Sequence, residues 1–599
     1  MHTDRRTFLV GAAAVALAPE VVAAQAGPAP NALYDRLVQA QLRRSPEGAT
    51  QLGLDTGANA DLRAKLSDQS FAGVERNRAA ARAEYAELGR VDRARLSADD
   101  QVAYDAVLYT RRSAVAVGQF AYGGSGYGPS PYVVSQQTGA YQDVPDFLDT
   151  KHKIETAGDA DAYLQRLQAF AGQLDDQTAR MRHDAGLGVI PPDYILDLTI
   201  DQMGKTAVPA EQALVVTSLR RRAAAKGLGD GYGAKAAALY TAQVLPALQR
   251  QLGLVRELRR TAKHDAGVWR LPQGDAFYAA ALKATTTSSM SPDEVHRFGL
   301  DQAAMLTARL DAELRRQGFT GGTVGQRMAA LYRNPAQLYP NTDAGKAQAI
   351  AYCNARLAAI RGRLPTVFER VPPYSFEVRR VPPQTEAGAA AAFSQSPAID
   401  GSRPGLVYFN MKDAGDWPRF ALATTVFHEG LPGHQLEGGL ALSNTDLPLI
   451  RKITGFSGYG EGWALYAEQL ADEIGMYDDD PLGRLGYLKF MLFRANRCVV
   501  DTGLHHLRWS REQGIARFVD GEGETPGFAA REVERYTVNP GQACSYKLGH
   551  SVFTDIRERA KAKLGARFDL KVYHTAVLRH GRLPLDVLRQ VGDRWMASA

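Results

Sequence analysis

Hydrophobic residues recur every three or four positions along most of the chain, which is the spacing typical of amphipathic helices. From Asn31 to about Asp265 the sequence predicts successive helices, of which DADAYLQRLQAFAGQLDDQTARM (159–181) is typical. The glycine- and proline-rich stretches GLGVIPPDY (186–194) and GLGDGYG (227–233) predict breaks between helices. No internal repeat interrupts this pattern.

The pattern changes after residue 270. The stretch SPDE (291–294) predicts a helix start, because serine caps the helix, proline fits its first turn and glutamate completes a capping box. YSFEVRRV (374–381) and GLVYFNM (405–411) are rich in β-branched and aromatic residues and predict two short strands. From Trp417 to the C-terminus the pattern is helical again.

These elements and the length of the chain predict a mainly α fold. With 599 residues the chain is too long for one compact core. We therefore expect a large bilobed helical body with a small β-sheet. Its N-terminal helical subdomain would cover residues 27–270, and a second helical subdomain, residues 271–599, would carry the sheet.

Composition excludes some classes of protein. The hydrophobic share of 45% and the charged share of 23% are ordinary for a globular protein. The net charge of +6 is spread along the chain without a dense basic block, so no nucleic-acid partner is expected. The three cysteines, Cys353, Cys498 and Cys544, are too few for a disulfide framework or a cysteine-ligated zinc site.

Residues 1–26 predict an export signal. Twin arginines, Arg5 and Arg6, precede a short apolar run, and Ala24-Gln25-Ala26 forms a cleavage site. The apolar run is much shorter than the roughly 20 residues that cross a bilayer. We expect the twin-arginine export machinery to carry the folded protein to the bacterial periplasm. No cysteine for a lipid anchor lies near the cleavage site, and no later stretch predicts an integral membrane segment.

The stretch FHEGLPGHQLEGG (427–439) resembles the zinc-peptidase motif HExxH with a different spacing. His428 and Glu429 fit the motif, but the next histidine, His434, lies six positions after His428. In a straight helix the two histidines would project roughly 120° apart. Pro432 and Gly433 lie between them and predict a break that returns His434 to the side of His428. The alternative is a pair of surface or capping histidines near a helix end.

Downstream carboxylates offer a third metal ligand. GYGEGWALYAEQLADEIG (458–475) places Glu461 at the start of a predicted helix, with Glu468 two turns later on the same face. His428, His434 and Glu461 would bind one zinc ion per chain and leave a position open for water, as catalytic zinc sites do. Glu429 would then be the general base. The alternatives are a helix-end charge for Glu461 and an exposed or metal-supporting role for Glu468.

A polar stripe follows in FRANRCVVDTGLHHLRW (493–509). Arg494, Arg497, Asp501 and His505 recur at steps of three or four residues and so share one helix face. Such stripes are often exposed ion pairs that contribute little stability. Apolar residues crowd the other faces here, which favours an inward stripe that binds a carboxylate or supports the metal site.

The segment RYTVNPGQACSYKLGH (535–550) is the last candidate. It contains tyrosine, lysine and histidine side chains, of which a tyrosine hydroxyl or a histidine could stabilise the oxyanion formed when water attacks an amide. The alternative is a structural role, which is the usual one for tyrosine. The residues in question are Tyr536, Tyr546, Lys547 and His550.

Together these motifs resemble a widespread bacterial family of unknown function marked by HExxPGH. The resemblance covers residues 30–597 and is carried by SPDEVHRFGL, HEGLPGH, EGWALYAEQL, VVDTGLHHLRW and NPGQACSYKLGH. That family is similar to helical zinc peptidases of the gluzincin type, which include dipeptidyl carboxypeptidases. The resemblance implies a bilobed, mostly α-helical body with a deep central channel and a small β-sheet near the metal site.

The resemblance also implies roles for individual residues. His428 and His434 match the two ligating histidines, Glu429 the base and Glu461 the third ligand. His505 and Tyr546 correspond more loosely to residues that contact the substrate or the transition state in that family. Both are catalytic candidates here. The family often has PGHHLQ where this chain has PGHQLEG, which makes Glu437 a rival third ligand.

We expect a zinc-dependent metallopeptidase acting on short peptides, with carboxypeptidase-like or dipeptidase-like action. Arg494 or Arg497 would hold a substrate carboxylate, and Tyr408, on the strand 405–411, is a further candidate for substrate binding. One alternative is a zinc amidohydrolase acting on a non-peptide amide at the same site. Another is a non-catalytic periplasmic binding protein with a vestigial metal site.

Overall fold

The structure is a computed structural model that describes residues 30–125, 128–229, 231–383, 386, 391–397 and 403–599. The predicted twin-arginine signal, residues 1–26, lies outside the described residues. Within the described ranges no helix is both long and apolar enough to cross a membrane.

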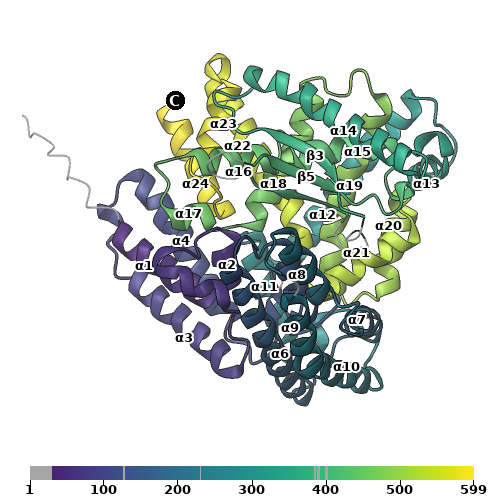
Figure 1. Cartoon of the computed structure of the whole chain (residues 1–599). Helices are drawn as coiled ribbons and strands as arrows, with labels where there is room; N and C mark the ends of the chain where they lie inside the picture. Colours follow the sequence, from purple (N-terminus) through teal and green to yellow (C-terminus); the bar gives the residue numbers. More distant parts are fainter. Residues whose placement is uncertain (1–29, 126–127, 230, 384–385, 387–390, 398–402) are drawn as a thin grey trace, which may run out of the picture.

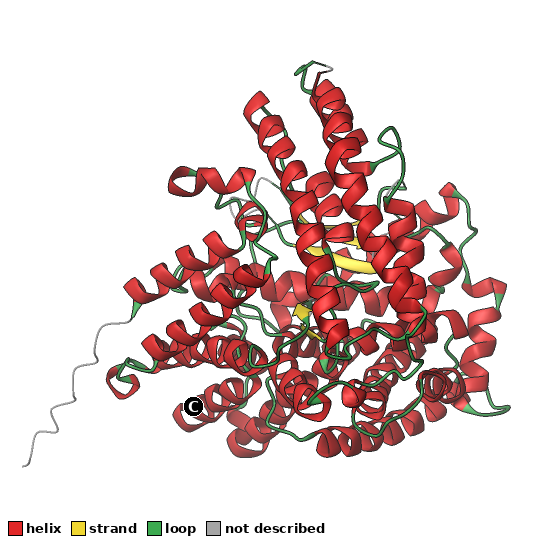
Figure 2. Cartoon of the chain, turned by 90° about the horizontal axis from the view of Figure 1, so that it is seen from below, coloured by secondary structure: helices red, strands yellow, loops and turns green. Residues whose placement is uncertain are grey.

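The fold is mainly α, as the hydrophobic pattern predicts (Figures 1 and 2). The first half of the chain contains α1 (Asn31–Arg44), α2 (Pro46–Gln51), α3 (Phe71–Leu88), α4 (Ala98–Val117), α5 (Ala140–Thr150), α6 (Ala157–Gly186), α7 (Asp193–Thr206), α8 (Leu214–Ala225), α9 (Gly231–Leu239), α10 (Leu245–Arg259) and α11 (Gly274–Thr286). These helices occupy the lower part of Figure 1.

The second half is helical as well, apart from one small sheet. It contains α12 (Pro292–Arg316), α13 (Val324–Arg333), α14 (Asp343–Arg363), α15 (Arg419–Glu429), α16 (His434–Ser443), α17 (Leu449–Ile453), α18 (Ser457–Glu473), α19 (Pro481–His505), α20 (Arg511–Glu522), α21 (Pro526–Val538), α22 (Ser545–Leu564), α23 (Leu570–Leu578) and α24 (Leu585–Ser598).

The structure confirms the predicted helix cap, a predicted helix break and the two predicted strands. Ser291 caps α12, and its hydroxyl and the carboxylate of Glu294 form the predicted capping box. The break GLGVIPPDY lies between α6 and α7. The two predicted strands are present as β3 (Phe376–Arg380) and β5 (Gly405–Phe409).

The small sheet also contains a strand that the sequence pattern did not predict. This strand, β4 (Ala392–Gln395), pairs antiparallel with β5, while β3 pairs parallel with β5 on its other side. The strand order β3-β5-β4 leaves β4 at an edge. Because β4 contacts both α15 and α16, this edge of the sheet lies beside the HEGLPGH segment. A separate two-stranded ribbon pairs β1 (Gly124–Ser125) with β2 (Pro129–Ser130).

Buried apolar side chains form three clusters among the described residues. One lies within residues 133–258, and a second joins residues 33–107 to Ile450. The largest cluster extends from Val102 to Val591 and includes the helices around the sheet. The predicted domain boundary at residue 270 and the deep central channel stay predictions.

Helices α18 and α22 pack unusually closely, and this contact places Glu461 near Tyr546. A Cβ atom added to Gly549 would lie 1.8 Å from the carbonyl oxygen of Gly458 and 2.7 Å from the Cα atom of Gly462. Only glycine fits such a backbone-to-backbone contact.

Replacing Gly549 by alanine should therefore push α22 away from α18. We expect Gly549→Ala to lose about 1–3 kcal/mol of stability through overpacking, or more if the helices cannot shift. The matched control is Gly172→Ala in α6, where an added Cβ would meet nothing within 4 Å. Thermal melts of both variants check this expectation, and equal melting temperatures for the two would contradict it.

Candidate metal centre

The HEGLPGH segment is a turn between two helices. Helix α15 ends at Glu429 and α16 begins at His434, so the two histidines stand on different helices that meet at the turn. The peptide bond between Leu431 and Pro432 is cis. The indole N–H of Trp463, on α18, donates a 2.9 Å hydrogen bond to the carbonyl oxygen of Pro432. The turn is thereby fixed to the helix that carries Glu461.

Gly433 allows the chain to turn this tightly. A Cβ atom at this position would lie 1.8 Å from the carbonyl oxygen of His428 and 2.5 Å from that of Phe427. Any other residue would therefore clash with the last turn of α15. Proline stops the helix and glycine permits its chain to fold back, which is the local reason for the six-residue spacing.

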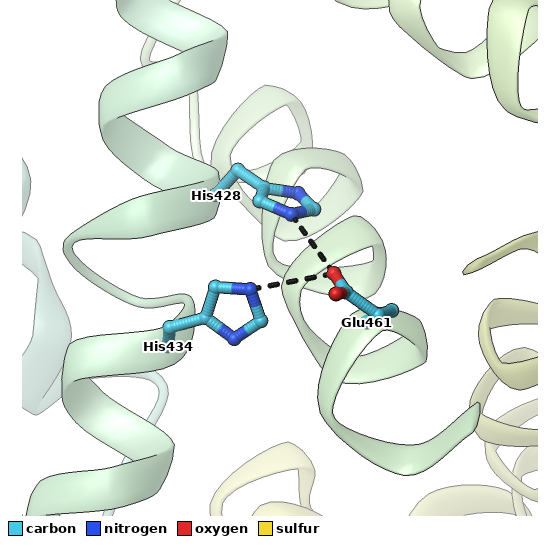
Figure 3. Close-up of side chains that lie close together, drawn as sticks. All are labelled: His428, His434 and Glu461. Carbon is cyan, nitrogen blue, oxygen red and sulfur yellow. Dashed lines mark ion pairs between the residues drawn. The ribbon is translucent and has the colours of Figure 1, made fainter. Parts of the chain in front are cut away.

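The structure brings His428, His434 and Glu461 together (Figure 3). The Nε2 atoms of both histidines lie 3.4 Å from the same oxygen, Oε2 of Glu461. One ligand atom from each of the three residues lies within 4.8 Å of the other two. The imidazole rings stand almost perpendicular, with an interplanar angle of 89° and centroids 5.0 Å apart.

The donor set fits a zinc ion. Zinc is bound by imidazole nitrogen and carboxylate oxygen at about 2.0–2.1 Å, and two such ligands of a tetrahedral ion lie about 3.3–3.4 Å apart. Both nitrogen-to-oxygen separations here have that value. His434 and Glu461 keep part of their side chains exposed, so the cluster is not sealed by protein. Three protein ligands with access to solvent are characteristic of a catalytic site, whereas structural zinc sites have four.

Glu468 orients His428 and is not part of the cluster. One of its oxygens accepts a 2.8 Å hydrogen bond from Nδ1 of His428, and the other accepts one of 2.5 Å from the hydroxyl of Thr424. A carboxylate that holds the second nitrogen of a ligating histidine is common in zinc sites. Glu468 lies two turns after Glu461 on α18, so it reaches the opposite nitrogen of the same imidazole ring.

The carboxylates change the protonation of the cluster. Burial alone would lower the pKa of His428, but hydrogen bonds to Glu461 and Glu468 outweigh it and raise this pKa to about 9. Burial would raise the pKa of Glu461, yet the two histidines hold it well below its usual range. Without a cation, the histidine ring takes up a proton to balance the buried carboxylates.

Glu437, the alternative third ligand, forms an ion pair with Arg582. Its two carboxylate oxygens accept hydrogen bonds of 2.9 to 3.2 Å from the guanidinium group of Arg582. Its side chain is almost fully buried. The cluster found in the structure therefore contains Glu461, and Glu437 anchors α16 to the segment that precedes α24.

Glu429 lies beside the cluster and is held by the sheet. The hydroxyl of Ser394, on β4, donates hydrogen bonds of 2.6 Å to Oε2 of Glu429 and 2.7 Å to its carbonyl oxygen. Sequence reasoning missed Ser394, since nothing in the short segment AFSQ marks it as functional. The contact depends on the pairing of β4 with β5, which only the tertiary structure shows.

Tyr546 is the other predicted residue that the structure places beside the cluster. Its ring is nearly parallel to that of His428, with centroids 6.2 Å apart and an interplanar angle of 17°. The guanidinium carbon of Arg497 lies 4.0 Å from the Tyr546 ring centroid, and that of Arg494 lies 5.4 Å away. Burial and the Glu461 charge raise the pKa of Tyr546 to about 12, so its hydroxyl stays protonated at neutral pH.

His505, also predicted to be catalytic, lies against the backbone of two other segments. The backbone N–H of Val268 donates to its Nδ1 at 3.2 Å, and its Nε2 is 3.0 Å from the carbonyl oxygen of Tyr536. Burial lowers the pKa of His505 to about 4, so the ring is neutral. Both ring nitrogens serve the backbone, and His505 ties α19 to two neighbouring segments. Asp501, one turn earlier, likewise accepts hydrogen bonds from Tyr278 and the Gly541 N–H.

Tyr408 does not face the cluster. It pairs with Phe393 across β4 and β5, and the two rings stack with centroids 5.0 Å apart. Because side chains alternate along a strand, Phe393 and Tyr408 lie on the face opposite to Ser394. Ser394 contacts Glu429 from the other face, and substrate binding by Tyr408 stays a prediction.

The turn gives a direct test of the geometry. Gly433→Ala should move His434 away from His428, because the new methyl group overlaps the His428 carbonyl oxygen. We expect loss of zinc binding and a stability decrease of about 1–3 kcal/mol. The matched control is Gly438→Ala, in the same helix, where nothing lies within 4 Å of an added Cβ. Zinc content and melting temperature distinguish the two variants; normal zinc content in Gly433→Ala would refute this role of the turn.

Comparison with known proteins places the fold and the family. Over 95% of its length the chain is similar to a candidate lipoprotein from Colwellia psychrerythraea, with 32% identity, a TM-score of 0.90 and 99% of that chain covered. It also shares its fold with a candidate lipoprotein of unknown function from Shewanella oneidensis, at 18% identity and a TM-score of 0.68, over 93% of this chain and 98% of that one. None of the curated proteins compared matches the chain. Residues 46–591 match the family described as bacterial protein of unknown function, DUF885, and the chain belongs to that family.

Proposed function

We propose that this protein is a zinc-dependent hydrolase of peptide bonds in short peptides. The observation that carries the proposal is the convergence of His428, His434 and Glu461, with Glu429 next in sequence to a candidate ligand. Two histidines and a glutamate that bind the metal, with a further carboxylate to act as base, are the minimal set of a metal-dependent peptidase. The HExxPGH motif would then be a form of the HExxH motif in which a turn replaces the continuous helix. A distant relationship to gluzincin-type peptidases is part of the same proposal.

The chemistry follows from the positions of these side chains. A bound zinc ion would act as a Lewis acid towards a carbonyl group and would acidify water. Glu429 would accept the proton from the attacking water and pass it to the leaving amine. Ser394 keeps the Glu429 carboxylate in place through its Oε2 atom. Glu468 keeps the His428 ring oriented through Nδ1.

We assign to Tyr546 the stabilisation of negative charge on the reacting carbonyl oxygen. Its ring packs alongside His428, and its hydroxyl is a hydrogen-bond donor at neutral pH. A donor fixed before the reaction stabilises a developing oxyanion more than water does. His505 stays the second candidate for this role, with both of its ring nitrogens on backbone groups.

The sheet supports a peptide as the substrate. Among the described strands β4 lies at the edge, and it touches the helices that carry the motif. An extended peptide can add to an exposed strand edge through main-chain hydrogen bonds. Such a peptide would run past Glu429, because Ser394 on β4 is bonded to that carboxylate.

We further propose that the protein works outside the cytoplasm. The twin arginines and the cleavage site within residues 1–26 support export. The similar chains from Colwellia and Shewanella are described as candidate lipoproteins, a class of exported protein. A periplasmic location would suit an enzyme that degrades short peptides.

Metal content tests the site before any substrate is known. We expect about one zinc ion per chain in the purified protein, and His434→Ala should lose it because two ligands bind zinc weakly. His264→Ala is a matched control, since His264 is exposed and pairs with Asp193 and Glu512 on the surface. Mass spectrometry of native protein measures both. Full zinc occupancy in His434→Ala would remove His434 from the site.

Glu429→Gln tests the chemistry separately. The variant should keep zinc but lose about 10²–10⁴-fold in kcat, the usual contribution of a general base. Glu377→Gln on β3, a half-exposed residue paired with Arg379, is the control. Cleavage of a short-peptide library, followed by mass spectrometry, gives the rates. Wild-type turnover in Glu429→Gln would end the proposed mechanism.

A further inference from the structure

Two arginines on α19 are buried among aromatic rings close to the candidate metal centre. Arg497 is 2% exposed and Arg494 is 9% exposed. The guanidinium carbon of Arg497 lies 4.0 Å from the ring centroid of Tyr546 and 5.4 Å from those of Phe493 and Tyr536. That of Arg494 lies 5.0 to 5.4 Å from the rings of Phe490, Phe493 and Tyr546.

These guanidinium groups have donors without acceptors. Nε and Nη2 of Arg497 and Nε of Arg494 are buried and find no hydrogen-bond partner in the described part of the chain. Neither arginine forms an ion pair with a carboxylate there, although the sequence stripe places Asp501 one turn from Arg497. Asp501 instead accepts hydrogen bonds from Tyr278 and from the backbone of Gly541.

Glu532, whose charge also acts on Arg497, has other partners. Glu532 accepts a 2.8 Å hydrogen bond from the hydroxyl of Tyr536. Its second oxygen lies 3.9 Å from Arg535. The cation pair formed by Arg494 and Arg497 is therefore held by aromatic faces and has no carboxylate within ion-pair distance among the described residues, although the charges of Glu532 and Glu461 act on Arg497 from further away.

An unpaired buried guanidinium is an unfavourable arrangement for folding alone. Arginine stays charged in proteins, so it cannot escape burial by losing a proton. Aromatic faces attract the charge but accept no strong hydrogen bond from its N–H groups. A buried donor left unsatisfied costs stability. Such a site is completed by an anion that accepts two parallel hydrogen bonds, and a carboxylate has the matching geometry.

Tyr546 lies between the cation pair and the candidate metal centre. The Tyr546 ring is nearly parallel to that of His428 and also packs against the guanidinium group of Arg497. A carboxylate on the arginines would therefore lie next to a peptide bond held at the candidate metal centre.

We infer that Arg494 and Arg497 form a subsite for a carboxylate of the substrate, adjacent to the bond that is cut. This inference rests on the proposed function. The carboxylate has two possible sources, the free C-terminus of the peptide or an acidic side chain near the bond. The first source makes the protein release residues from the C-terminus; the second makes it select acidic sequences.

Matched peptides separate these sources. Three versions of one short peptide are compared: a free C-terminal acid, its C-terminal amide, and the amide with aspartate placed beside the cleaved bond. For the wild-type protein we expect kcat/KM for at least one carboxylate peptide to exceed that for the plain amide by about 10²-fold, as loss of a buried charge pair predicts. The peptide that is preferred identifies the source.

The arginine variants test the residues themselves. Arg497→Gln should reduce the preference for the carboxylate peptide to a few-fold, mainly through KM, while zinc content stays at the wild-type level. Arg494→Gln, at a less buried position, provides a second variant if Arg497→Gln does not fold. The matched control is Arg484→Gln, on the same helix, where the arginine pairs with Asp472 and Asp478. That control should keep the full preference.

The outcomes separate the subsite from the proposed function. Equal hydrolysis of all three peptides by the wild-type protein would overturn the subsite and leave the metallopeptidase intact. An unchanged preference in both arginine variants would assign the carboxylate to other residues and would also overturn the inference. If the zinc-loaded protein cleaves no peptide, the proposed function fails. Calorimetric binding of the acid and amide peptides then decides the subsite: tighter acid binding that Arg497→Gln abolishes supports it, and equal binding overturns it.

Discussion

The candidate site depends on a backbone constraint, the tight turn that joins α15 to α16. Gly433 lets the chain pass against the carbonyl oxygen of His428, and Trp463 holds the turn through the carbonyl oxygen of Pro432. Trp463 and Glu461 lie two residues apart on α18, so one helix fixes the turn and supplies the third candidate ligand. The position of both histidines therefore follows from packing between three helices.

The four glutamates around this turn have different partners. Glu461 faces both imidazole rings, Glu468 binds the rear nitrogen of His428, and Glu437 is neutralised by Arg582. Glu429 is held by a serine hydroxyl from the sheet. Burial makes these differences matter, because an uncompensated charge is costly in the interior and each carboxylate must find a cation or donors. Their separate partners distinguish the candidate ligand, the group that orients His428, the anchor of α16 and the candidate base.

The two ends of the polar stripe on α19 also differ in the partners of their side chains. Asp501 and His505 satisfy their hydrogen bonds with neighbouring backbone and side chains, and they join α19 to the segments before α11 and α22. Arg494 and Arg497 have only aromatic faces. A continuous stripe in sequence thus divides into a structural half and a half that holds two buried cations next to Tyr546. The boundary between the halves falls where α19 leaves the neighbourhood of the candidate metal centre.

The sequence by itself determined the mainly α fold, the capped start of α12 and the strands β3 and β5, and it singled out His428, His434 and Glu429 together with several glutamates as candidates for the third ligand. These depend on local periodicity, caps and a helix-breaking Pro-Gly pair, which neighbouring residues encode. Only the tertiary structure decided between Glu461, Glu468 and Glu437, brought Ser394 to Glu429, turned Tyr408 away and engaged His505 with the backbone. Those outcomes depend on strand pairing and on contacts between helices far apart in sequence, where several carboxylates or rings are equally suitable and only packing selects among them.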